Sequence, residues 1–145
     1  MRPELLAVIT AVLWATGAFF GKRGMAQAGL QPQQGLTIRL VISALVLLAL
    51  TAPRLGELVR GLGTDLGRRG IGQIALFEGL VAGSLGMLAF YTALRHGAIS
   101  RVVPLAFTVP LWGFLLGVFV AGEAVTLTKA LGVAAVVAGI VLLNV

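Results

Sequence analysis

Glu78 is the ionisable residue that lies deepest within an apolar stretch of this sequence. It follows Ile71, where the stretch begins, by seven residues, which is about 10 Å along a helix at ~1.5 Å per residue. A carboxylate removed from water favours its protonated form, and this chemistry suits proton-coupled binding of a cation. The structural alternative is a glutamate that reaches the polar surface or bonds to a neighbouring helix. The sequence leaves both interpretations open.

Aromatic and proline residues inside other apolar stretches are further candidates. Trp14 lies in the middle of an apolar stretch rather than at its end, where interfacial aromatic residues gather, so it either lines a cavity or packs against lipid or protein, and Tyr91 is a similar case. Pro104 and Pro110 each remove a backbone hydrogen bond from the stretch 98–121. Such prolines predict either a hinge or cavity-lining position, or a kink that serves packing alone.

The composition around these residues is that of an integral membrane protein. Of the 145 residues, 59% are hydrophobic and 11% are charged, whereas a soluble domain has about 25% charged residues. Five stretches approach the ~20 residues that cross ~30 Å of hydrocarbon, at about 4–21, 36–52, 71–94, 98–121 and 126–145. We therefore predict an all-α integral membrane fold in which residues 1–145 form one domain of five transmembrane helices. The connection 53–70 has leucines at helical spacing between charges, which predicts a short helix in the headgroup region.

Several kinds of site are incompatible with this sequence. There is no cysteine and only one histidine, His96, so we expect no metal site, no catalytic thiol and no cofactor. Ser84 and His96 are twelve residues apart on one predicted helix, or roughly 18 Å, too far for a nucleophile and its base. We therefore expect no enzymatic activity. The net charge of +6 is spread between apolar stretches, which indicates contact with the lipid bilayer rather than with nucleic acid.

The basic residues are divided almost equally between the two sides that a five-span chain would have. Six belong to the side of the N-terminus, namely Arg2, Arg54, Arg60, Arg68, Arg69 and Lys129. Five belong to the other side, namely Lys22, Arg23, Arg39, Arg95 and Arg101. The positive-inside rule then gives two interpretations: a cytoplasmic N-terminus set by the basic 53–70 connection, or insertion in both orientations and an antiparallel dimer. In that dimer, Glu78 of one protomer would lie at nearly the depth of Arg39 of its partner.

Three stretches, taken together, have a recognisable order and spacing. They are Leu13-Trp14-Ala15-Thr16-Gly17, Arg39 followed by apolar residues, and a run from Tyr91 to Leu143 that includes Ala93-Leu94, Gly97-Ala98, Ser100, Pro110, Gly122-Glu123, Leu131-Gly132 and Gly139. The pattern resembles one five-helix repeat of the EamA family, in the drug/metabolite transporter superfamily, over essentially the whole chain.

The resemblance implies a secondary transporter of a small metabolite or drug that works by alternating access in the cytoplasmic (inner) membrane. Family members typically have ten spans in two inverted repeats. For this chain, that pattern implies either a homodimer, for which an antiparallel arrangement is one option, or pairing with a partner transporter half. The alternative is a non-transporting membrane scaffold or subunit that pairs with another transporter half.

The candidate site residues combine the groups found within the apolar stretches with this resemblance. We expect contacts with the small-molecule substrate or coupling ion from Glu78, Arg39, Trp14 and Tyr91. We expect hinge or cavity-lining roles for Pro104 and Pro110. Glu123 matches a family position near the membrane surface, where we expect a structural role.

Overall fold

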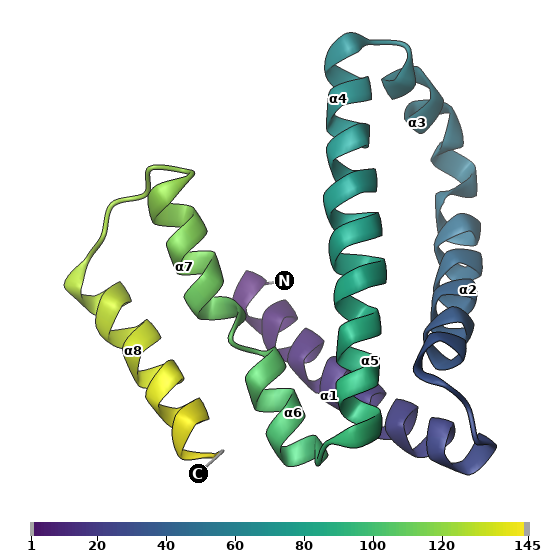
Figure 1. Cartoon of the computed structure of the whole chain (residues 1–145). Coiled ribbons are helices and arrows are strands. Elements are labelled where there is room, and N and C mark those ends of the chain that lie inside the picture. Colours follow the sequence, from purple (N-terminus) through teal and green to yellow (C-terminus); the bar gives the residue numbers. More distant parts are fainter. Residues whose placement is uncertain (1, 144–145) are drawn as a thin grey trace. The chain divides into compact units, whose positions relative to one another are not determined.

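The computed structural model describes residues 2–143, which form helices joined by short turns with no strand among them (Figure 1). The elements are α1 (Pro3–Ala28), α2 (Pro32–Thr51), the 3₁₀-helix η1 (Ala52–Arg54), α3 (Leu55–Leu62), α4 (Asp65–Gln73), the π-helix η2 (Ile74–Gly86), α5 (Met87–His96), α6 (Ile99–Ala106), α7 (Val109–Phe119) and α8 (Leu127–Leu142). Four stretches are long and apolar enough to cross a membrane, namely Pro3–Ala28, Pro32–Leu62, Asp65–His96 and Ile99–Phe119. The apolar helix α8 is shorter, at 16 residues. The predicted all-helical class is confirmed, with four spans and one shorter helix where five spans were expected.

The turn between the first two helices lies further along the sequence than the end predicted from Lys22 and Arg23. Helix α1 passes Gly21, its predicted end, by seven residues and continues through Lys22 and Arg23, because both side chains are good helix formers. It ends where Gly29 takes a φ of +64° and Leu30 donates its N–H to the carbonyl oxygen of Met25 at 3.0 Å. Helix α2 then begins at Pro32 rather than at residue 36, since proline suits the first helical position.

The connection 53–70 is helical, but it is not one separate helix. Pro53 lies in the first turn of η1, where its missing N–H breaks no bond, so the helical path continues into α3. Helix α4 starts after a turn at Gly63–Thr64, where the Thr64 hydroxyl oxygen accepts a hydrogen bond from the Gly67 N–H at 3.1 Å. The prediction of a single helix here is therefore wrong: two helices extend the second and third spans and meet at a turn.

The third span has a π-helical middle. Helix η2 is 13 residues long, whereas π-helices are mostly single turns within α-helices. A side-chain hydrogen bond has the same five-residue spacing as the π-helical backbone: the Ser84 hydroxyl donates to the carbonyl oxygen of Gly79, five residues earlier, at 2.9 Å. Glu78 lies in this segment. It therefore belongs to backbone with i→i+5 bonding rather than to the regular α-helix that the sequence predicted.

The chain divides into two compact units, whose boundaries lie within α1 and at the end of α5. One unit comprises Gly21–Arg95 and the other comprises Met1–Phe20 with His96–Val145. In the first unit, α2 and α3 run antiparallel to α4, η2 and α5, with the hairpin turn between α3 and α4 (Figure 1). In the second unit, α7 and α8 form a hairpin of their own (Figure 1).

Candidate functional site

The unit Gly21–Arg95 has one buried cluster, formed where the end of α1, the start of α2 and α5 meet. Met25, Leu36 and Tyr91 make its centre, with exposed fractions of 5%, 6% and 8%. Partly buried apolar side chains surround them, namely Leu30, Met87, Leu88 and Phe90. We call these seven residues the Tyr91 cluster. Because they come from three helices and the α1–α2 turn, the cluster holds the open end of the α2–α5 hairpin together.

Gly35 allows this close packing. A Cβ atom at Gly35 would lie 2.8 Å from Cγ and Sδ of Met25 and 3.4 Å from Cε1 of Tyr91. A Cβ atom at Gly21 would lie 3.7 Å from the Tyr91 hydroxyl oxygen, which is an ordinary contact. The absence of a side chain at Gly35 therefore lets α2 approach both α1 and the aromatic ring.

A polar contact lies beside the Tyr91 cluster. The Arg95 guanidinium donates a hydrogen bond to the side-chain oxygen of Gln31, which joins the end of α5 to the residue before α2. The Gln31 backbone N–H in turn donates to the side-chain oxygen of Gln34 at 2.8 Å. The sequence analysis treated Arg95 only as a topology signal, because a contact across 64 residues of chain has no local signature.

Of the four predicted binding residues, three lie in this unit but not at one point. Tyr91 is buried in the cluster, Arg39 is half-buried on α2, and Glu78 is exposed on η2. The ion pairs described within residues 2–143 are Arg68–Asp65 and Lys129–Glu123, so neither Glu78 nor Arg39 belongs to them. The structure thus brings Tyr91 into contact with α1 and α2, and leaves the Glu78 side chain open on its helix.

The fourth predicted residue, Trp14, lies in the other unit beside a break in the helix. The stretch predicted as one helix over 98–121 is divided into α6 and α7 at Phe107–Thr108. Pro104 lies inside α6 and Pro110 in the first turn of α7. The rings of Trp14 and Phe107 are 5.7 Å apart between centroids and tilted by 55°. The structure therefore brings an aromatic contact from α1 to the point where the two prolines interrupt the fourth span.

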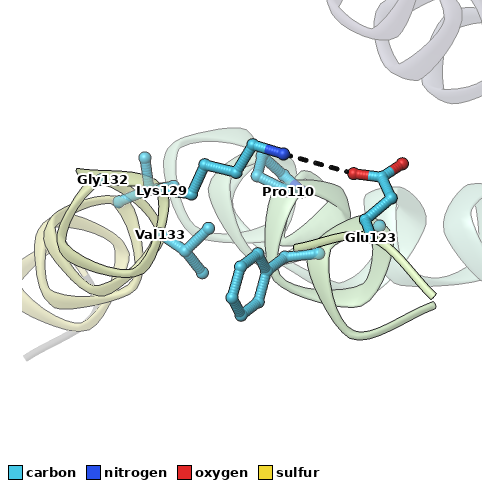
Figure 2. Close-up of a pocket in the computed structure, with 8 residues that line it drawn as sticks. Pro110, Glu123, Lys129, Gly132 and Val133 are labelled. Carbon is cyan, nitrogen blue, oxygen red and sulfur yellow. Dashed lines mark hydrogen bonds and ion pairs between the residues drawn. The ribbon is translucent and has the colours of Figure 1, made fainter. Parts of the chain in front are cut away.

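The same unit contains a groove between α7 and α8 that the sequence analysis missed. Its volume is about 420 Å³, and its lining residues are Pro110, Gly113, Phe114, Glu123, Lys129, Gly132, Val133 and Val136. Figure 2 shows the Lys129 side chain reaching across one end of it toward the Glu123 carboxylate. The ammonium nitrogen and the carboxylate oxygen are 3.4 Å apart, and both side chains are more than half exposed.

Local backbone geometry places this ion pair. Gly122 has a φ of +70°, a conformation that favours glycine, and Glu123 then donates its N–H back to the carbonyl oxygen of Gly117 at 2.9 Å. On the other side, the Thr126 hydroxyl oxygen caps α8 by accepting the N–H of Lys129 at 3.2 Å. One sequence signal could have indicated this pair: Gly122-Glu123 comes shortly before Thr126, the residue that caps α8. A glutamate at that position faces the start of the next helix.

Comparisons with known proteins agree with the resemblance noted in the sequence. The model of the EamA-like transporter family matches residues 1–145, the whole chain. Neither the search of curated proteins nor the search of solved structures gave a match. Together with the four membrane-length apolar helices, the match indicates a multi-pass membrane transporter of the drug/metabolite superfamily. The chain belongs to the EamA-like transporter family.

Proposed function

We propose that this chain is one half of a secondary transporter that moves a small metabolite or drug across the cytoplasmic membrane by alternating access. Family membership carries the proposal. The second half is another five-helix unit in inverted orientation, supplied by a second copy. The near-equal division of cations between the two sides supports insertion in both orientations.

The exposure of the helices supports the need for a second half. Almost none of the residues in the four apolar spans is buried within the described chain. Hydrocarbon can cover such faces, but it cannot form the walls of an aqueous substrate path. A second unit that covers one of these faces supplies those walls, as inverted repeats do in transporters of this general kind.

The Tyr91 cluster provides a contact that alternating access can open. It joins α1, α2 and α5 at one end of the hairpin, and the Arg95–Gln31 hydrogen bond lies beside it. We assign this end as the closed gate of the state described here. Opening it requires α5 to separate from the α1–α2 turn. This movement exposes Tyr91 to the substrate path, where it can make the predicted contact with the substrate or coupling ion.

Glu78 is the residue we assign to the coupling ion. A carboxylate within a membrane span is costly unless it serves binding or transport, and its side chain is exposed on η2 rather than paired in an ion pair of the described residues. In the inverted dimer it pairs with Arg39 of the partner. Trp14, beside the break in the fourth span, lines the path together with Pro104 and Pro110.

Proteoliposomes loaded with a pH-sensitive dye test this assignment. A panel of amino acids and cationic drugs is added outside, and proton movement driven by each compound is recorded. We expect at least one compound to drive a proton flux that Glu78→Gln abolishes. Glu57→Gln is the matched control, because Glu57 is an exposed carboxylate in α3, outside the apolar part of the span. Equal flux from the Glu78→Gln variant and the wild type would overturn the coupling role.

The same experiment separates a transporter from a scaffold. A scaffold would show no flux with any compound and would copurify with a different transporter half. A pure protein that moves a compound without another polypeptide contradicts the scaffold and supports the homodimer.

A further inference from the structure

We propose that the groove between α7 and α8 binds a zwitterionic phospholipid, with an ethanolamine phosphate headgroup at the Glu123–Lys129 pair and an acyl chain along the groove. The test of this site measures lipid binding rather than transport, so it does not depend on the proposed function. Two observations carry it: paired opposite charges at one end, and an apolar trough below them.

The charges at the end of the groove match the headgroup in sign. Lys129 lies in the first turn of α8, so its ammonium and the positive end of the helix both favour a phosphate. Glu123 offers a carboxylate that accepts hydrogen bonds from a primary ammonium. The pair is exposed, and its 3.4 Å separation exceeds the 2.7–2.9 Å typical of charged hydrogen bonds. A zwitterion can insert between them and leave each charge with a partner.

The trough below the pair suits an acyl chain. Phe114, Val133 and Val136 line it, and Lys129 to Val136 spans seven residues, or about 10 Å of helix. Gly113 and Gly132 lie on open parts of its lining, since a Cβ atom at either position would have no neighbour within 4 Å. Figure 2 shows Gly132 and Val133 on one side of the trough and Pro110 on the other. The lining is therefore apolar along its length and charged at one end.

A phospholipid fits this pattern better than a helix of a second copy does. A partner helix would have to present two opposite charges above a narrow apolar ridge. A phosphatidylethanolamine molecule has both charges on one headgroup and an acyl chain directly attached to it. The surrounding bilayer also supplies it at high local concentration.

Native mass spectrometry of the purified protein tests the proposal with three added lipids: phosphatidylethanolamine, phosphatidylglycerol and phosphatidylcholine. We expect phosphatidylethanolamine to bind about fivefold more tightly than phosphatidylglycerol, as one exposed ion pair implies. Phosphatidylcholine carries a quaternary ammonium that donates no hydrogen bond, and it should also bind less tightly. Glu123→Gln should remove the preference for phosphatidylethanolamine, whereas Lys129→Gln should weaken binding of all three lipids.

Two glycine variants test the trough itself. Gly132→Leu fills it and should reduce lipid binding. Gly139→Leu is the matched control on the same helix, since Gly139 has no neighbour within 4 Å and does not line the groove. Equal binding of the three lipids to the wild type, or unchanged binding in all groove variants, would overturn the proposal. Groove variants that bind lipid normally but convert dimers to monomers would assign the groove to a second copy and overturn it as well.

Discussion

The Tyr91 cluster and the α7–α8 groove join helices in opposite ways. In the cluster, three helices meet around an aromatic ring that is 8% exposed, and Gly35 removes the side chain that would keep them apart. In the groove, two helices leave a trough of about 420 Å³, and an ion pair with exposed fractions of 53% and 59% crosses its end. The comparison indicates that side-chain packing, rather than charge pairing, holds the open end of the α2–α5 hairpin together. The groove remains available to another molecule.

The largest expected effect comes from removing the ring at the centre of the cluster. Tyr91→Ala should lower the free energy of unfolding by about 2 kcal/mol. In a micelle the unfolded chain also keeps its apolar side chains out of water, but the substitution still leaves an empty cavity in the folded cluster, and that cavity is costly. Trp112→Ala removes a larger ring that is 60% exposed, and it should nevertheless cost well under half as much. Titration of the purified protein in mixed micelles with dodecyl sulfate measures both. Equal losses would show that the cluster is no better packed than the lipid-facing surface.

A smaller effect is expected from adding one methyl group inside the cluster. Gly35→Ala places its Cβ 2.8 Å from Met25, and the flexible thioether must move aside at a cost of about 1 kcal/mol. Gly24→Ala is the matched control on α1, where a Cβ has no neighbour within 4 Å; it should be neutral or stabilising, because alanine favours a helix. The same titration gives both values. The cost of Gly35→Ala should also shrink in a Met25→Ala background, and an unchanged cost there would contradict the assigned contact.

The smallest effect is expected from the ion pair of the groove. Lys129→Gln should change the free energy of unfolding by about 0.5 kcal/mol or less, because both charges are exposed and screened by solvent. The difference should fall further at high salt, which the same titration with added sodium chloride detects. A loss above about 2 kcal/mol would indicate a buried, strongly coupled pair and would remove the contrast between the two regions.

The sequence predicted the helical class because hydrophobic length and charge spacing are local properties. The ends of the helices were less predictable. Lys22 and Arg23 interrupt the apolar pattern but not the helix, and Pro53 lies where a proline costs no hydrogen bond. The stretch 98–121 was predicted as one helix, with a hinge or a kink at Pro104 and Pro110 because each proline removes a backbone bond, and the structure divides it into α6 and α7.

The contacts that define the two regions depend on long-range geometry. The approach of Tyr91 to Met25 requires the turn at Gly29 and the missing side chain at Gly35. The Glu123–Lys129 pair likewise depends on the positive φ of Gly122. None of these follows from residue spacing along a single helix. The π-helical bonding around Glu78 also escaped the hydrophobic pattern, because an apolar segment has the same composition in α- and π-helical form.

Insertion in both orientations is the central claim, and topology reporters fused after Val145 test it most directly. One fusion carries a fluorescent protein that matures in the cytoplasm, and the other carries a phosphatase that is active only outside it. We predict comparable signal from both fusions when they are expressed at equal levels, because five spans would divide the cations almost equally between the two sides. Signal from one fusion alone would mean a single orientation and would contradict the inverted homodimer.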